Sequence, residues 1–340
     1  MKTLLVILGP TAVGKTELAL RVAERLGTVI VNADSRQIYR DMPICTAAPT
    51  PVQIARVKHY FVGTHALHET FSAAQFETEA LGVLEAELAQ RDTVVLTGGS
   101  MMYIDALLRG IDDMPNVDPD VRRSVRRQYE AEGLDPLLAM LRLLDPDYYA
   151  RVDRRNTQRV LHGVEMCLST GRPFSSFHTG RCKPRPFRIV QVGLQRERPE
   201  LYARIDARVQ AMIEAGLVEE ARAIVARLAD SVPEGEPESD ASAASVGPTG
   251  KAAPSGTAPV CDRLTRRYNA LCTVGMKEML LYLDGVYTLP QACQQIAHAT
   301  RIYSKKQMTW FRRDPQITWF HPDETDKIDV FLHAQSVFVL

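Results

Sequence analysis

Near the start of the chain, two apolar patterns follow each other and predict a strand and then a helix. Residues 4–8 form a continuous apolar run ended by Gly9-Pro10, as in a strand buried on both faces of a parallel sheet. Apolar positions in residues 16–26 then recur at helical spacing. The alternation continues with further runs, namely strands at 29–31 and 93–96 and a helix over 73–90. This order predicts an α/β protein with a parallel sheet flanked by helices.

The middle of the chain departs from this alternation. Residues 116–184 show helical, Arg-rich patterning without a convincing strand. Strand character returns over 188–194 and is followed by a long helical pattern over 198–228. We therefore predict an all-helical domain inserted into a core that resumes afterwards. The predicted parts are a discontinuous core (1–115 and 185–313), the insertion (116–184) and a C-terminal tail (314–340).

One segment has no periodicity of either kind. In residues 231–260, 22 of the 30 residues are Ala, Gly, Pro, Ser or Thr, and none is aromatic. Such a segment buries too little apolar surface to offset its ordering entropy. It is predicted to be a disordered, low-complexity loop. Helical periodicity resumes after it and extends over 264–313, with a break near Asp284-Gly285.

The charge balance does not identify a partner by its total, because 41 basic and 41 acidic residues cancel. The distribution is uneven: residues 262–313 contain nine Lys or Arg against three acids. This excess is compatible with a polyanionic partner and equally with solvated helix faces. Six scattered cysteines without metal-ligand spacing indicate reduced thiols in a cytoplasmic protein. No stretch approaches the ~20 apolar residues of a membrane span, so no membrane partner is expected.

The first predicted strand leads into GPTAVGKT, which fits the phosphate-binding pattern G-x-x-x-x-G-K-[ST]. In this motif backbone N–H groups and the N-terminus of the following helix bind phosphate oxygens, the lysine adds a positive charge, and the Ser/Thr hydroxyl binds Mg2+. The fold is therefore predicted to be P-loop NTPase-like, with Thr16 as the magnesium ligand. The strand at 93–96 ends in Thr97-Gly98-Gly99 rather than in an acid, which disfavours a standard NTP hydrolase. The predicted phosphate-binding residues are Gly9, Pro10, Thr11, Ala12, Val13, Gly14, Lys15 and Thr16.

An acidic residue follows the second predicted strand. Ligands of doubly wound sheets bind at the C-terminal ends of strands, so Asp34 is expected close to the phosphate loop. It is a candidate general base, and an Asx turn or helix cap is an equally good interpretation. The next residues, Ser35, Arg36 and Gln37, carry hydrogen-bonding groups suited to a polar ligand, and Gln can pair with adenine through two hydrogen bonds.

Seven sequence blocks follow one another along most of the chain: GPTAVGKT, DSRQIYR (34–40), TGGSMMY (97–103), NTQRVLHGVEMCLSTGRPFSSF (156–177), RIDARVQAMIEAGLVEE (204–220), VGMKEML (274–280) and RIYSKKQMTWFRR (301–313). In this order they resemble the tRNA dimethylallyltransferases, also called tRNA isopentenyltransferases. The resemblance implies transfer of the dimethylallyl group from dimethylallyl diphosphate to the exocyclic amine of the adenosine on the 3′ side of the anticodon, in tRNAs that read codons beginning with U. It implies Mg2+ as cofactor, the anticodon stem-loop as partner, and a monomeric enzyme.

The resemblance also implies residue roles. Lys15, Thr16 and Arg208 match residues that bind the diphosphate and its Mg2+, and Asp34 matches the base that accepts the amine proton. Two positions depart from the family's usual residues: Ser100 replaces a Thr and keeps its hydroxyl, whereas His162 replaces a common Arg. Trp310 and Phe311 are expected to pack in the core rather than stack on bases. The residues expected to contact tRNA are Asp34, Ser35, Arg36, Gln37, Ser100, Arg122, Gln158, Arg159, Val160, Leu161 and His162.

Three other functions share some of these features. A P-loop kinase of a nucleotide or small metabolite would use the same loop and acid, but the Arg-rich insertion and the lack of an obvious ATP lid disfavour it. An adenylate isopentenyltransferase would prenylate free AMP, ADP or ATP, and the insertion and basic C-terminal block favour an RNA substrate instead. A nucleic-acid-binding ATPase would show RNA-stimulated hydrolysis without transfer.

Overall fold

The computed structural model describes residues 2–229 and 260–338, so the predicted disordered loop at 231–260 lies almost wholly outside the described residues. The chain divides into two compact units, one formed by Met1–Leu108 and Arg185–Leu340 and the other by Arg109–Pro184. No helix among the described residues is long and apolar enough to cross a membrane.

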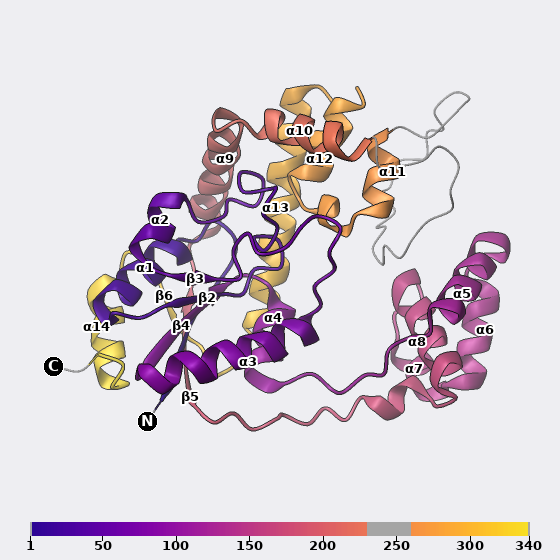
Figure 1. The fold of residues 1–340 in the computed structure, drawn as a ribbon, viewed down its shortest axis with the longest axis horizontal. Helices are drawn as coiled ribbons and strands as arrows, with labels where there is room; N and C mark the ends of the chain where they lie inside the picture. The colour runs from indigo at the N-terminus through magenta and orange to yellow at the C-terminus, as the bar shows by residue number, and fades with distance from the viewer. Residues whose placement is uncertain (1, 230–259, 339–340) are drawn as a thin grey trace. The chain divides into compact units, whose positions relative to one another are not determined.

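The first unit is built on one sheet whose described strands are all parallel, in the order β3-β2-β4-β1-β5-β6 (Figure 1). The predicted α/β fold with helices around a parallel sheet is confirmed. β1 and β4 are buried at every position, which explains why their sequences are continuously apolar. The strands are β1 (Thr3–Leu8), β2 (Ile30–Asn32), β3 (His59–Tyr60), β4 (Thr93–Gly98), β5 (Arg188–Leu194) and β6 (Thr318–Phe320).

Helices flank this sheet (Figure 1). The long helical pattern predicted over 198–228 forms two helices, because Gly216 adopts φ 100° between them. The helices of this unit are α1 (Lys15–Leu26), α2 (Pro51–Arg56), α3 (Ala73–Gln90), α4 (Met101–Arg109), α9 (Arg198–Glu214), α10 (Leu217–Ala229), α11 (Val260–Arg267), α12 (Met276–Leu283), α13 (Leu289–Phe311) and α14 (Thr325–Ala334), with a 3-10 turn at Asn269–Cys272.

The segment 314–340 was predicted as a tail beyond the core, but its described residues, 314–338, are part of the core unit, so this boundary was wrong. β6 pairs with β5, and Asp329 of α14 forms ion pairs with Arg21 and Arg25 of α1. Ile328 and Leu332 of the same helix are buried. The acidic residues of the segment led to its interpretation as a tail, although it contains a three-residue strand and a helix with one apolar face.

The second unit is all-helical and has its own core. It contains α5 (Pro119–Glu132), α6 (Asp135–Leu144), α7 (Pro146–Arg151) and α8 (Thr157–Thr170), followed by a 3-10 turn at Phe174–Phe177. Its buried centre consists of Val125, Leu137, Leu141, Val160, Leu161 and Val164. The separate core explains why this segment shows only helical periodicity in the sequence.

The strand register of the first unit determines where its chemistry lies. Leu8, the last residue of β1, pairs with Gly98 of β4 and Gly193 of β5, and Asn32 of β2 pairs with Thr97. The loops that follow β1, β2 and β4 therefore leave the same edge of the sheet. This is the edge at which parallel sheets bind ligands.

Candidate active site

The phosphate loop connects β1 to α1 and requires glycine at two positions. A Cβ on Gly9 would lie 2.6 Å from the carbonyl oxygen of Leu194, and Gly14, the N-cap of α1, adopts φ 117°. Two arginines hold the loop from outside the motif: Arg196 Nε donates to the Val13 carbonyl and Arg204 Nε to the Ala12 carbonyl, both at 2.9 Å. The loop therefore has a defined shape at the N-terminus of α1, where an anion is stabilised by free backbone N–H groups.

Lys15 lies against the loop that it follows. Its ammonium donates to the carbonyls of Gly9 at 3.0 Å and Pro10 at 2.9 Å. Burial of this group lowers the pKa of Lys15 to about 8, an effect that Asp34 opposes and Arg208 reinforces. A bound anion beside Lys15 would offset the cost of this desolvation by favouring the charged ammonium.

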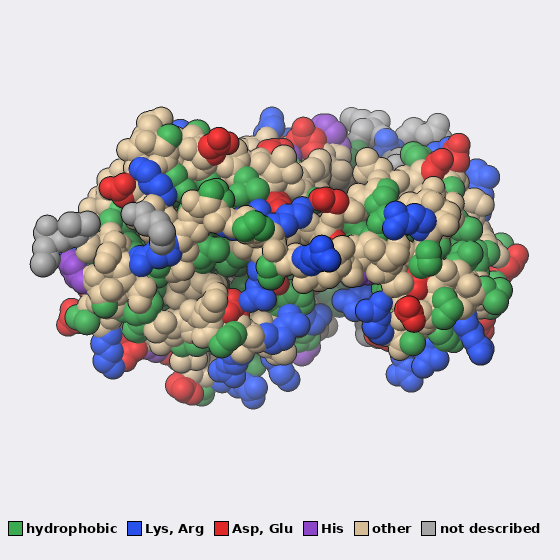
Figure 2. Space-filling model, turned by 90° about the horizontal axis from the view of Figure 1, so that it is seen from below, with side chains coloured by type: hydrophobic (Ala, Val, Ile, Leu, Met, Phe, Trp, Pro, Cys, Tyr) green, Lys and Arg blue, Asp and Glu red, His purple; other side chains and the backbone are tan. Residues whose placement is uncertain are grey.

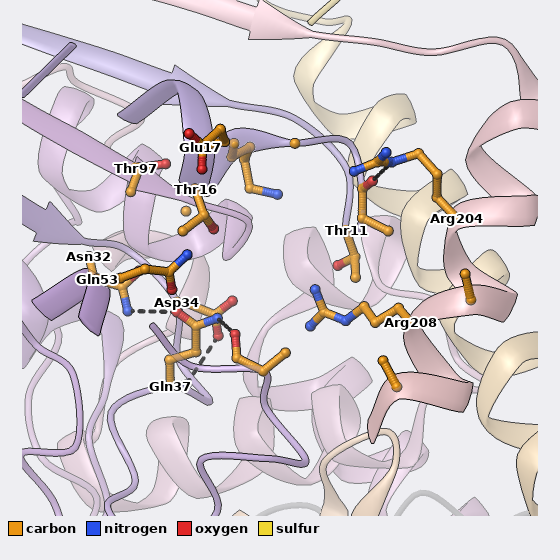
Figure 3. A pocket seen from close by; sticks show the side chains of 17 residues that line it. Thr11, Thr16, Glu17, Asn32, Asp34, Gln37, Gln53, Thr97, Arg204 and Arg208 are labelled. Carbon is orange, nitrogen blue, oxygen red and sulfur yellow. Dashed lines mark hydrogen bonds between the residues drawn. The ribbon is translucent and has the colours of Figure 1, made fainter. Parts of the chain in front are cut away.

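Asp34 forms the Asx turn that was one of its two predicted roles, and it also lines the cavity in which a general base would act. Its Oδ1 accepts from the backbone N–H of Arg36 at 2.9 Å and of Gln37 at 3.3 Å, which is an Asx turn. The side chain is only partly buried and lines the same pocket as Lys15 (Figure 3). The turn fixes the Asp34 carboxylate just after the C-terminal end of β2.

Arg208 enters the pocket from α9. Its Nη2 donates to the Thr46 carbonyl at 3.3 Å. Burial lowers the pKa of Arg208, and the nearby Asp34 opposes that shift. The loop that carries Thr46 is itself fixed, because the Glu220 carboxylate accepts from the backbone N–H groups of Ile44 and Cys45, each at 2.8 Å.

These groups surround a cavity of about 500 Å³ (Figure 3). Three cations (Lys15, Arg204 and Arg208) and two carboxylates (Glu17 and Asp34) line the cavity, so its lining has a net positive charge. Lys15 and Arg208 are the two buried cations. Such a cavity suits a ligand with several negative charges, and a diphosphate fits this description. The lining residues are Thr11, Ala12, Gly14, Lys15, Thr16, Glu17, Asn32, Asp34, Gln37, Ala47, Gln53, Thr97, Gly98, Arg204, Ala207, Arg208 and Ala211.

The other residues predicted beside Asp34 are held by internal hydrogen bonds. Ser100 Oγ accepts from the Ser35 backbone N–H at 2.8 Å and donates to Ser35 Oγ at 3.0 Å. Arg36 donates to the carbonyl of Asn269 at 3.1 Å. The Gln37 amide donates to the carbonyls of Thr46 and Ala47, so this group supports the pocket wall in the free protein.

The residues predicted to contact tRNA in the helical unit separate into two faces of α8. Gln158, Arg159 and His162 are exposed. Val160 and Leu161 are buried in the apolar centre of the unit, so the predicted contact with RNA was wrong for these two side chains.

Ionisable side chains of α5 and α8 lie together around the buried carboxylate of Glu165. His162 Nδ1 lies 3.8 Å and Arg122 Nε 3.7 Å from Glu165 Oε2, which brings these two predicted residues to one carboxylate. Lys and Arg side chains are exposed over the surface of the unit (Figure 2).

Sequence reasoning missed three residues that form hydrogen bonds with the phosphate loop: Arg196, Arg204 and Gln307, whose Oε1 accepts from the Thr11 N–H at 2.9 Å. Gln307 lies in the C-terminal basic block, whose prediction as an RNA-binding segment rested on its Lys and Arg residues and not on this amide. Of the two aromatic residues predicted to pack in the core, Phe311 is buried, and Trp310 is partly buried and donates from Nε1 to Asp105 at 2.8 Å.

Glu200, His321 and Asp323 form a cluster of possible metal ligands beside the phosphate loop, with ligand atoms within 4.8 Å of one another. Arg196 forms ion pairs with both carboxylates, so these side chains already belong to an ion-pair network. The Thr16 hydroxyl remains the candidate magnesium ligand.

The fold and the pocket together define a class: an α/β protein of the P-loop type, with a basic cavity at the N-terminus of its first helix and a carboxylate that lines this cavity. Comparison with known proteins identifies the family. The IPP transferase family matches residues 37–314. The chain is 54% identical to tRNA dimethylallyltransferase 2 of Porphyromonas gingivalis, over 96% of this chain and 95% of that protein, and 49% identical to tRNA dimethylallyltransferase 1 of Phocaeicola vulgatus, over 98% of each.

Solved structures agree with this result. The tRNA isopentenylpyrophosphate transferase of Bacillus halodurans superimposes with a TM-score of 0.64 at 29% identity, covering 98% of this chain and 96% of that one. A eukaryotic dimethylallyltransferase acting on tRNA has a TM-score of 0.71 at 22% identity, covering 91% of this chain and 70% of that one, and supports the fold. The chain belongs to the IPP transferase family and is a prenyltransferase of the kind that modifies tRNA, which confirms the resemblance seen in the sequence.

Proposed function

We propose that this enzyme transfers the dimethylallyl group of dimethylallyl diphosphate to the exocyclic amine of the adenosine on the 3′ side of the anticodon, in tRNAs that read codons beginning with U. The products are isopentenyladenosine and diphosphate. The observation that carries the proposal is the cavity in which Lys15 and Arg208 face Asp34 at the end of the sheet. The names of the relatives support tRNA as the acceptor and disfavour free adenine nucleotides.

Different residues of this cavity would act on the leaving group and on the attacking amine. The allylic C–O bond breaks, and the electron pair leaves with the diphosphate, which Lys15, Arg208 and the loop N–H groups stabilise. The adenine amine then forms the new C–N bond and passes a proton to the Asp34 carboxylate. Because an allylic cation forms readily, the enzyme's main tasks are to bind the leaving group and to align the amine.

Mg2+ fits the donor groups of this cavity. The hydroxyl of Thr16 would hold the ion together with oxygens of the diphosphate, and hard oxygen donors are what Mg2+ prefers. The ion would supply additional positive charge to the leaving group. We expect transfer to fall by ~10-fold or more when Mg2+ is removed with a chelator, and to return on adding it back. Full activity in the chelated enzyme, measured as labelled prenyl incorporated into tRNA, would contradict this role.

The target base has to leave its stack in the anticodon loop to reach Asp34, so base flipping is part of the proposal. Exposed cations such as Arg159 on the helical unit would neutralise phosphates of the anticodon stem. We further propose that the enzyme acts as a monomer in the cytoplasm.

The decisive test is mass spectrometry of nucleosides from tRNA incubated with the enzyme, dimethylallyl diphosphate and Mg2+. A prenyl mass gain on adenosine supports the proposal. Transfer of γ-phosphate from ATP to a small molecule, without prenyl transfer, would instead indicate the kinase alternative.

The lowered pKa of Lys15 gives a pH prediction. A Lys whose pKa is about 8 loses its charge as the pH rises through that value. We expect kcat/KM for the prenyl donor to fall above about pH 8, because kcat/KM reports the free enzyme. kcat should fall less, because bound diphosphate stabilises the ammonium. The measurement is the pH profile of both constants, and a kcat/KM that stays constant through pH 9 to 10 (about one to two units above the pKa) would contradict the assignment.

A further inference from the structure

We propose that Gln307 is a positioning residue that sets the phosphate loop against the loop after β4, and so fixes the leaving group relative to the acceptor base. The proposal rests on the transfer reaction described above. Gln307 lies on α13, and its side chain is fully buried. Its Oε1 accepts from Thr11 N at 2.9 Å and lies 3.4 Å from Thr11 Oγ1, while its Nε2 donates to the Gly99 carbonyl at 2.8 Å.

The two ends of this amide have different partners, which fixes its orientation. The Thr11 N–H requires an acceptor, and the Gly99 carbonyl requires a donor. Only a primary amide of this length meets both requirements, since a carboxylate cannot donate and an alkyl group can do neither. Because the group is buried, an unpaired end would carry a desolvation penalty, so the bridge holds both loops in one arrangement.

Each end of the bridge is close to one half of the reaction. Thr11 lines the cavity in the same loop as Lys15. Gly99 precedes Ser100, whose hydroxyl accepts from the backbone N–H of Ser35, next to Asp34. The amide therefore links the diphosphate side of the site to the base side. A misplacement of about 1 Å between reacting groups can cost ~100-fold in rate.

Gly99 supplies independent support for this arrangement. A Cβ at this position would lie 2.5 Å from Gln307 Nε2, whereas the next nearest atoms, Gln307 Cδ and Lys15 Nζ, are 3.7 and 3.8 Å away. The backbone of Gly99 does not itself require glycine, because its φ is outside the left-handed region. Gly99 is therefore constrained by the side chain of Gln307. Gly98 differs, because its Cβ would lie 2.2 Å from the backbone oxygen of Ala33.

This difference provides the test. Gln307→Ala, Gly99→Ala and the double variant are assayed for transfer of labelled prenyl to tRNA, with kcat and both KM values measured and folding checked by thermal unfolding. We expect each single change to lower kcat by ~10- to 100-fold with the KM for tRNA nearly unchanged. The double variant should be no slower than Gln307→Ala alone, because the clash at residue 99 disappears with the amide. As a matched control, the loss caused by Gly98→Ala should persist in the Gln307→Ala background.

Additive losses in the double variant, or a wild-type kcat in Gln307→Ala, would overturn the proposal. If Gln307→Ala does not fold, kcat is measured in Gln307→Met, which keeps the length of the side chain but forms no such hydrogen bonds. A lowered kcat in this variant supports the bridge, and a wild-type kcat overturns it. Wild-type enzyme in the same assay separates the two proposals. Active wild type with unaffected variants refutes only the role of Gln307, whereas inactive wild type refutes the transfer reaction and this role with it.

Discussion

Asp34→Asn is expected to slow prenyl transfer by ~100-fold or more while leaving tRNA binding close to wild type. The structure makes this substitution a clean one. Asn keeps the oxygen that accepts from the backbone N–H groups of Arg36 and Gln37, so the Asx turn is retained. The amide cannot accept a proton from the adenine amine. Single-turnover transfer rates and a tRNA binding titration, performed on the same preparation, measure the two effects separately.

Two further variants complete this experiment. Asp34→Ala removes the turn as well as the base, so its excess loss over Asp34→Asn measures the contribution of the turn. Asp41→Asn makes the same chemical change at a surface ion pair with Arg227 and should leave transfer within a factor of about two. Near-normal turnover in Asp34→Asn would remove Asp34 as the proton acceptor.

The fold was largely predictable because its main strands are buried on both faces. β1, β2 and β4 appear in the sequence as apolar runs, and β5 as a mostly apolar segment interrupted by Gln191. β3 and β6 were missed because two and three residues are too short to show any periodicity. Their strand conformation depends on pairing with β2 and β5, which is a tertiary effect.

The site was predictable to the extent that its residues are local in sequence or follow a strand. The phosphate loop is a contiguous motif, and Asp34 follows from the topology of a parallel sheet. Gln307 lies 296 residues from Thr11, and no spacing in the sequence connects the two. Val160 and Leu161 show the opposite error, because they were predicted to contact RNA and are buried. The prediction included every residue of a matching sequence block, whereas a helix exposes only one of its faces.

Arg208 is the residue whose role depended most on the resemblance, since nothing in its local sequence distinguishes it from a surface arginine. We expect Arg208→Gln to lower kcat by ~100- to 1,000-fold, because a preorganised cation in a desolvated site stabilises the charge that develops on the leaving diphosphate. Arg198 provides the matched control, because it lies on the same helix, is exposed and is not among the residues that line the cavity. Arg198→Gln should therefore leave kcat close to the wild-type value.

Thermal unfolding distinguishes a catalytic role of Arg208 from a structural one. Burial lowers the pKa of this guanidinium, which means that desolvation of its charge opposes folding of the free enzyme. Replacing it with neutral Gln should therefore leave the Tm at or above the wild-type value while transfer is lost, as is typical of residues kept for activity rather than stability. A lowered Tm together with a nearly normal kcat would assign Arg208 to the framework of the pocket instead. Because the loss of leaving-group stabilisation concerns the donor side alone, tRNA affinity should be unchanged in either case.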